Sequence, residues 1–307
     1  MISVIIPNYN HASFLIDRIN SVLNQTYQDF ELIILDDCSK DESISVIEGF
    51  RNHPKVSHVI YNKQNSGSPF QQWKKGIELA SGEWIWLAES DDVAEPTFLE
   101  TMIENIKKSD NVVLSYCASE SIDAFGNKNG KNTWANSVSD RNWDNNFLNS
   151  GKTEIITQLF YKNTIPNASA VVFQKDAIDF SVFETIVKMK FTGDWMFWVS
   201  ILQKGDVAYD HRLLNNFRYH DSSTRSWKSK EMELKRFEEC LIVMRAIKER
   251  YKLQWDYRKH IWIIDEWIVK SQSFNQSRFK VFNKLFPISY NLVVFLKKIK
   301  QLSIRYL

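Results

Sequence analysis

A cluster of carboxylates directly follows a run of hydrophobic residues in the first third of the chain. The stretch WLAESDDVAEP, residues 86–96, places Glu89, Asp91 and Asp92 after the apolar run Trp84–Leu87, which is typical of a buried strand. Neighbouring carboxylates repel one another, so such a cluster favours a positively charged partner. Hard oxygen ligands suit Mg²⁺ or Mn²⁺, and these ions commonly complete their shell with substrate phosphates. The cluster therefore predicts half of a divalent metal site.

Two further polar clusters each follow a predicted strand. NYN comes after the apolar run 2–7, and DD comes after the run 30–35. Because the carboxyl ends of parallel strands meet at one edge of a sheet, ligands bind there. We expect Tyr9, Asp37 and the acid cluster to share one site. The alternative is structural, since Asp also favours turns and helix N-caps.

The elements that would position these clusters follow from the hydrophobic pattern. Nearly all-apolar strands that alternate with helices indicate a parallel sheet covered on both faces. We therefore predict an α/β fold whose mostly parallel sheet is flanked by helices, with Gly82 capping the helix before the fourth strand. The predicted strands are 2–7, 30–35, 56–61 and 83–87, and the predicted helices begin near 14, 43 and 70.

Composition restricts the class of protein. A chain of 307 residues that is 44% hydrophobic buries one large core, or one core and an appendage. Three widely spaced cysteines without a metal-ligand pattern fit reduced thiols and a cytoplasmic protein. We find no signal peptide and no run of about 18 apolar residues, and therefore expect no membrane-spanning helix.

The charge is unevenly distributed. Residues 227–307 carry 18 Lys and Arg against 8 Asp and Glu, while the whole chain has a net charge of +2. Within this part, residues 279–307 contain basic residues, no acid and interleaved apolar residues. Such a surface fits peripheral contact with an anionic membrane at its inner face, or packing on the core or on a second subunit. We expect no nucleic-acid partner, because no recognition motif is present.

Two long stretches resemble a known family. SVIIPNYNHASFLIDRINSVLNQTYQDFELIILDDCSKDES and NSGSPFQQWKKGIELASGEWIWLAESDDVAEP are similar to the nucleotide-binding half of inverting family-two glycosyltransferases with the GT-A fold. The resemblance runs from residue 2 to about residue 100 and continues in two patches, FTGDWMFWVSILQKG and FRYHDSSTRS. It implies a GT-A domain at 1–226, with a nucleotide-binding half at 1–100 and an acceptor-binding half at 101–226. A helical, basic appendage at 227–307 would follow.

The resemblance also implies roles for residues of the nucleotide site. Pro7, Tyr9 and Asn10 match the first-strand loop that holds the nucleotide base, with Tyr9 suited to stacking. Asp37 matches the carboxylate that binds the base, usually uracil. Asn65, in the turn after the third strand, is assigned to the nucleotide sugar as well.

The acid cluster matches the Asp-x-Asp-like motif of the family. Asp91 corresponds to the acid near the ribose, and Asp92 to the acid that coordinates Mn²⁺ or Mg²⁺ between the phosphates. Glu89 stands where many relatives have another Asp, and its role stays open. His220 matches a position where some relatives direct a His to the metal, with an ordinary surface histidine as the alternative.

The patch TGDWMFW holds the candidate catalytic base, Asp194. Transfer with inversion requires a base that deprotonates the acceptor hydroxyl, and partial desolvation would raise the pKa of a carboxyl toward that task. The structural alternative is an N-cap of the helix 195–202. Trp195, Asn167 and Ser169 are candidate acceptor contacts.

The polar stretch 118–164 is either a functional loop or disordered. Trp134, Trp143 and Phe147 favour an ordered acceptor-side flap. Together the residues predict transfer of a sugar, most simply from a UDP-sugar, to a glycan or lipid-linked saccharide in bacterial-type surface polysaccharide synthesis. The alternatives are a nucleotide-sugar-binding protein without turnover and a nucleotidyltransferase; an oligomer is compatible with either class.

Overall fold

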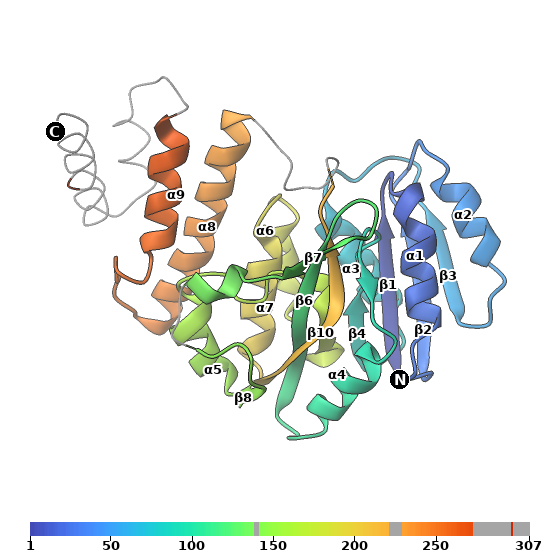
Figure 1. Cartoon of the computed structure of the whole chain (residues 1–307), viewed down its shortest axis with the longest axis horizontal. Coiled ribbons are helices and arrows are strands. Elements are labelled where there is room, and N and C mark those ends of the chain that lie inside the picture. The colour runs from blue at the N-terminus through green and yellow to red at the C-terminus, as the bar shows by residue number, and fades with distance from the viewer. Residues whose placement is uncertain (138–140, 221–228, 273–295, 297–307) are drawn as a thin grey trace.

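The computed structural model describes residues 1–137, 141–220, 229–272 and 296. Their centre is a 10-stranded sheet with the strand order β3-β2-β1-β4-β9-β6-β10-β5, in which β7 also pairs with β6 and β8 with β10. Helices cover both faces of this sheet (Figure 1). The α/β prediction is thereby confirmed.

Four parallel strands form one half of the sheet, in the predicted alternation with helices. β1 (Ile2–Asn8) lies between β2 (Phe30–Asp36) and β4 (Trp84–Leu87), and β3 (Val56–Tyr61) borders β2. Asn8 pairs with Asp36 in this register, so the polar loops after β1 and β2 begin side by side. The connecting helices are α1 (Ala12–Leu23), α2 (Ser43–Phe50) and α3 (Pro69–Leu79).

The predicted cap at Gly82 is wrong. Helix α3 ends at Leu79, and Ala80 is its C-cap. A Cβ atom at Gly82 would lie 2.7 Å from the backbone nitrogen of Ser3, and the Gly82 N–H donates to Ser3 Oγ at 2.8 Å. Glycine therefore permits close approach of the chain to β1 at this position.

The other half of the sheet includes two long strands, β6 (Val112–Ile122) and β10 (Asp206–Arg218), that the hydrophobic pattern did not reveal. β9 (Val171–Gln174) runs antiparallel to both β4 and β6 (Val112–Ile122), so the sheet is mixed. β10 (Asp206–Arg218) pairs in parallel with β6. The remaining elements are β5 (Val93–Ala94), α4 (Phe98–Ile106), β7 (Lys128–Lys131), η1 (Trp134–Ser137), β8 (Phe147–Asn149), α5 (Gly151–Glu154), η2 (Ile155–Leu159), η3 (Ala168–Ala170), η4 (Lys175–Ala177), η5 (Phe180–Val182), α6 (Phe183–Ile186) and α7 (Gly193–Leu202).

The stretch after residue 118 is ordered where the structure describes it. Strand β6 continues to Ile122 because polar residues in it find partners: Asn215 of β10 donates to Ser119 at 3.2 Å. Trp143 packs edge-on against Tyr209, with ring centroids 5.5 Å apart. The aromatic residues thus order this segment, whereas its role as a flap stays a prediction.

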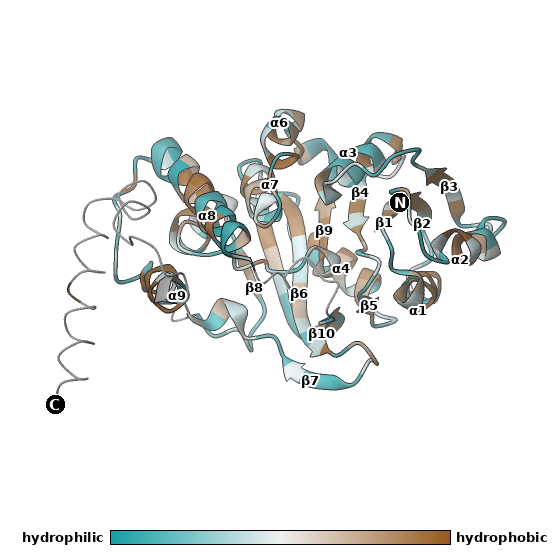
Figure 2. Ribbon diagram, turned by 90° about the horizontal axis from the view of Figure 1, so that it is seen from above, coloured by the Kyte–Doolittle hydropathy of each residue, from teal (hydrophilic) through white to brown (hydrophobic). Residues whose placement is uncertain are grey.

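The two faces of the sheet hold two separate apolar clusters. Alternation along β1 sends Ile5 to one cluster and Val4 and Ile6 to the other. Figure 2 shows α3, α6 and α7 on the first face and α1 and α4 on the second.

Two C-terminal helices join the cluster on the α7 face. α8 (Lys230–Tyr251) and α9 (Ile261–Gln272) bury Phe237, Met244 and Trp267 in the same cluster as Phe197 and Trp198 of α7. The appendage is therefore helical as far as residue 272 and packs on the sheet domain.

Some predictions concern residues outside the described part. The boundary between 226 and 227 and the basic segment 279–307 both fall largely there, so they stay predictions. Within residues 1–137, 141–220 and 229–272, no helix has the length and hydropathy that crossing a bilayer requires.

Candidate active site

The loop after β2 holds Asp37 under the turn that follows β3. Its carboxylate accepts hydrogen bonds from Asn62 Nδ2 at 2.6 Å, Ser66 Oγ at 2.7 Å and Gln72 Nε2 at 2.9 Å. The backbone N–H of Ser66 also donates to it. Asp37 is only 4% exposed, so in this conformation it orders the turn. A bound nucleotide base would have to share or displace these donors.

The loop after β1 is tied to the same region. Asn10 adopts a left-handed backbone (φ 55°), its side-chain oxygen accepts from the N–H of Lys40 at 2.7 Å, and its own N–H donates to Ser39 Oγ. Tyr9 beside it is 45% exposed and leaves its ring available at the rim. Pro7 is buried within β1.

Asn65 shapes the turn after β3. It accepts from the N–H of Gly67 at 2.6 Å and donates to the Asp37 carbonyl at 3.3 Å. Its side chain therefore supports the loop that surrounds Asp37, and direct contact with a nucleotide stays a prediction.

Three side chains form a cluster with the character of a metal site. One donor atom each from His11, Asp91 and His220 lies within 4.8 Å of the others. His220 Nε2 is 3.0 Å from Asp91 Oδ2, and His11 Nδ1 is 2.8 Å from Ser90 Oγ. His11 begins the turn into α1, whereas His220 follows β10, so the two histidines come from opposite ends of the domain. The sequence prediction included His220 but missed His11, whose only signal is its position after NYN.

Asp92, the predicted metal ligand, lies outside this cluster, and its role at a metal stays a prediction. Its side chain is 1% exposed, and its Oδ1 accepts the backbone N–H of Arg218 at 2.9 Å. Its Oδ2 lies 3.9 Å from Nη2 of the fully buried Arg18. Consecutive residues in this turn face different sides, so the cluster with His220 contains Asp91, which was predicted near the ribose.

Burial and mutual repulsion set the charges of the acid cluster. Burial and the charge of Asp91 raise the pKa of Glu89 to about 8, despite a hydrogen bond from Trp73 Nε1 at 2.8 Å. Burial also raises the pKa of Asp91, but contacts with His220 and His11 outweigh it and lower the net pKa. Burial and the neighbouring Asp91 raise the pKa of Asp92. These shifts favour the ionised form of Asp91 and the neutral form of Glu89.

Two arginines, Arg18 and Arg218, bind the backbone of the acid turn. Arg18 of α1 donates to the Glu89 carbonyl at 2.7 Å, and Arg218 donates to the Asp91 carbonyl at 2.7 Å. Burial lowers the pKa of Arg18 to about 10, so it remains charged at neutral pH. These contacts to carbonyls fix the backbone of the acid turn.

Asp194 faces the same cavity as the acid cluster. This cavity has a volume of about 410 Å³, and its walls include Asp91, Asp92 and Asp194. Asp194 lies in the first turn of α7, where Thr192 rather than Asp194 is the N-cap. Asn163 Nδ2 donates to Asp194 Oδ2 at 3.0 Å and orients it.

The three predicted acceptor residues have different environments. Trp195 is 1% exposed and donates its indole N–H to the Leu159 carbonyl at 2.9 Å, although its edge reaches the cavity wall. Asn167 also lines the cavity, but its Oδ1 accepts from the N–H of Ser169. Ser169 is fully buried and accepts from the N–H of Glu89 at 3.1 Å. Ser169 therefore supports the acid turn, and direct contact with the acceptor stays a prediction.

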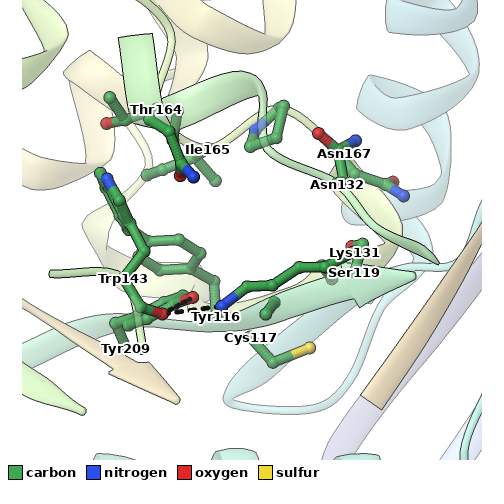
Figure 3. A pocket seen from close by; sticks show the side chains of 15 residues that line it. Tyr116, Cys117, Ser119, Lys131, Asn132, Trp143, Thr164, Ile165, Asn167 and Tyr209 are labelled. Atoms are coloured by element: carbon green, nitrogen blue, oxygen red, sulfur yellow. Dashed lines mark hydrogen bonds between the residues drawn. The ribbon is translucent and has the colours of Figure 1, made fainter. Parts of the chain in front are cut away.

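A second, smaller pocket lies behind Asn167, as Figure 3 shows. Its walls include Tyr116, Asn132 and Thr164, and its volume is about 30 Å³. That volume holds about one or two water molecules and excludes a sugar ring. Of these two, only the cavity lined by Asp91 and Asp194 has room for a sugar ring.

The fold agrees with solved structures of the GT-A class. The S. aureus protein TarS, residues 1–349 in complex with UDP-GlcNAc, superimposes with a TM-score of 0.59 at 18% identity, over 94% of this chain and 77% of that one. This likeness confirms the GT-A fold, a mostly parallel sheet flanked by helices.

Sequence comparison identifies the family. The family described as glycosyl transferase family 2 matches residues 3–179, more than half of the chain, and the chain belongs to it. The putative teichuronic acid biosynthesis glycosyltransferase TuaG of Bacillus subtilis is 25% identical over 75% of this chain and 84% of its own. Glycosyltransferase GlyG of Streptococcus pneumoniae is 33% identical, but the match covers only 36% of each chain. The chondroitin synthase of Escherichia coli is 31% identical over 43% of this chain and 19% of its own.

Proposed function

We propose that this glycosyltransferase moves a sugar, with inversion and with the aid of a divalent metal, from a UDP-sugar to a saccharide or lipid-linked acceptor in surface polysaccharide synthesis. One observation carries the proposal: Asp91 of the metal-type cluster and the carboxylate of Asp194 line a single cavity. The names of TuaG and chondroitin synthase support the polysaccharide context, and the UDP-GlcNAc complex of TarS supports the donor class.

His11, Asp91 and His220 would hold the metal. Their donor set of one carboxylate and two imidazoles suits Mn²⁺ better than Mg²⁺, which prefers oxygen ligands. A bound cation would neutralise the negative charge that develops on the departing diphosphate. The protein contributes the position of the cluster, fixed by the contacts of Arg18 and Arg218 to the acid turn.

The nucleotide would lie along the loops after β1 and β2. Tyr9 offers an exposed ring for stacking on the base, and Asp37 offers the carboxylate for its N–H group. Pro7, Asn10 and Asn65 would act by shaping these two loops.

Asp194 would act as the general base. It would accept the proton of the acceptor hydroxyl as the new bond to the anomeric carbon forms and the bond from that carbon to the diphosphate oxygen breaks. The hydrogen bond from Asn163 holds one carboxylate oxygen, which leaves Asp194 a defined orientation toward the cavity. Trp195 and Asn167 complete the wall near it.

The test is transfer from a panel of nucleotide sugars with Mn²⁺, for the wild type, Asp194→Asn and the exposed control Asp110→Asn. We expect Asp194→Asn to lower kcat by about 10²–10⁴-fold at an unchanged Tm, because a general base contributes about that factor. Full transfer by Asp194→Asn would refute the assignment of the base. A wild type that binds UDP-sugars but transfers none would instead favour the binding protein without turnover.

A further inference from the structure

The cavity extends beyond Asp194 into a region built by Trp134 and by elements C-terminal to the family match. That match ends at residue 179, whereas much of the cavity wall comes from the segment before α7 and from α8 and α9. We call this region the distal subsite, and it consists of Trp134, Lys190, Arg236, Trp262, Glu266 and Lys270.

Trp134 presents an aromatic surface to the distal subsite. The Lys162 ammonium lies 3.7 Å from its ring centroid and covers one face, while Trp262 packs edge-on with centroids 6.0 Å apart. Trp134 is nevertheless 37% exposed, and it lines the cavity. Burial of Lys162 under this ring fixes the indole in place, which lowers the entropy lost on binding.

Charged side chains beside this ring are held in a network. Arg236 Nη2 is 2.6 Å from Glu266 Oε1, and Arg236 Nε donates to Glu233 Oε2 at 3.3 Å. Lys270 Nζ lies 2.8 Å from the other oxygen of Glu233. The network therefore offers fixed donors and fixed acceptors within one wall of the cavity, as a polyhydroxylated ligand requires.

The distal subsite is connected to the candidate base. The indole N–H of Trp134 donates to the carbonyl of Asn163 at 3.0 Å, and the side chain of Asn163 donates to Asp194. A ligand on Trp134 would thus bind next to the group that deprotonates the acceptor.

We propose that the distal subsite binds a pyranose ring of the acceptor, with its apolar C–H face stacked on Trp134 and its hydroxyls bonded to the Arg236–Glu266 network. That the bound saccharide is the acceptor rests on the proposed function. That a saccharide ring binds to Trp134 does not depend on it. An aromatic ring excludes water from the apolar face of a sugar, and fixed charged groups bind hydroxyls more strongly than neutral ones.

The experiment is saturation-transfer NMR with the methyl glycosides of glucose, N-acetylglucosamine and glucuronic acid, on the full chain without donor. We expect saturation transfer to the ring C–H protons of the glycosides. Trp134→Ala should lower the affinity for the glycoside about tenfold, and Trp134→Phe, which keeps an aromatic face, should retain it. Tyr257→Ala, at a residue 43% exposed and outside the cavity, is the matched control and should behave like the wild type. The neutral and acidic glycosides distinguish a hydroxyl-bonding from a carboxylate-bonding network.

The outcomes separate this proposal from the proposed function. Equal binding by wild type and Trp134→Ala, or no saturation transfer to any of the three glycosides, would overturn the distal subsite. Binding that depends on Trp134 in a protein that transfers no sugar would support the subsite and refute glycosyl transfer.

Discussion

Asp91→Asn and Asp92→Asn, two adjacent substitutions of the same type, should have opposite effects on metal binding and stability. Asp91 belongs to the cluster with His11 and His220, so its substitution removes a charged ligand. Even outer-shell partners of metal ligands contribute about 10–100-fold to affinity, and we expect Asp91→Asn to weaken Mn²⁺ binding by at least about 100-fold. The same substitution relieves repulsion on Asp92 but weakens the contact with His220, so we expect a smaller change in Tm than for Asp92→Asn.

Asp92→Asn should instead reduce stability and leave Mn²⁺ binding near the wild-type value. Asparagine still accepts the N–H of Arg218, but Arg18 loses its counter-charge while fully buried. Breaking a buried ion pair costs about 3–5 kcal/mol, and the 3.9 Å separation puts this pair at the lower end. About 3 kcal/mol corresponds to a fall in Tm of about 5 °C for a chain of this size.

The assay combines isothermal titration with Mn²⁺ and thermal unfolding, both at mildly alkaline pH, where Asp92 is ionised despite its raised pKa. Loss of Mn²⁺ binding in Asp92→Asn together with its retention in Asp91→Asn would refute the assignment and restore Asp92 as the ligand.

Two further predictions concern stability and the position of the base. Glu239 of α8 accepts three backbone N–H groups from the segment before α7. Glu239→Gln should therefore lower the free energy of unfolding by about 2 kcal/mol and lower kcat by displacing Asp194. The exposed control Glu238→Gln should change neither quantity, and thermal unfolding and initial rates would measure both. Burial lowers the pKa of His260 from 6.5 to about 4. As the pH falls, His260 is therefore protonated in the unfolded chain before it is protonated in the folded one. About 3 kcal/mol of the free energy of unfolding should be lost between about pH 6.5 and pH 4. His260→Gln should flatten this part of the pH dependence of Tm, and the exposed His53→Gln should keep it; equal slopes in both variants would contradict the assignment.

Continuous apolar runs made the first half of the fold predictable. Strands β1, β2 and β4 are buried on both faces, and such strands need no partner information to be recognised. Strands β6 and β10 contain polar residues that only cross-strand partners satisfy, as in the Asn215–Ser119 hydrogen bond. Their sequence therefore resembles a loop, and both strands were missed.

The sequence by itself determined that polar clusters end three neighbouring strands, because strand direction and the location of ligand sites follow from the alternation of strands and helices. The tertiary structure alone decided which adjacent carboxylate joins the histidines. That choice depends on Arg18 and Arg218, which reach the acid turn from distant elements; Arg218 binds Asp92 across 126 positions of the chain. Partners from distant elements set the direction of a side chain in a turn. The local sequence around the turn does not reveal which partners these are.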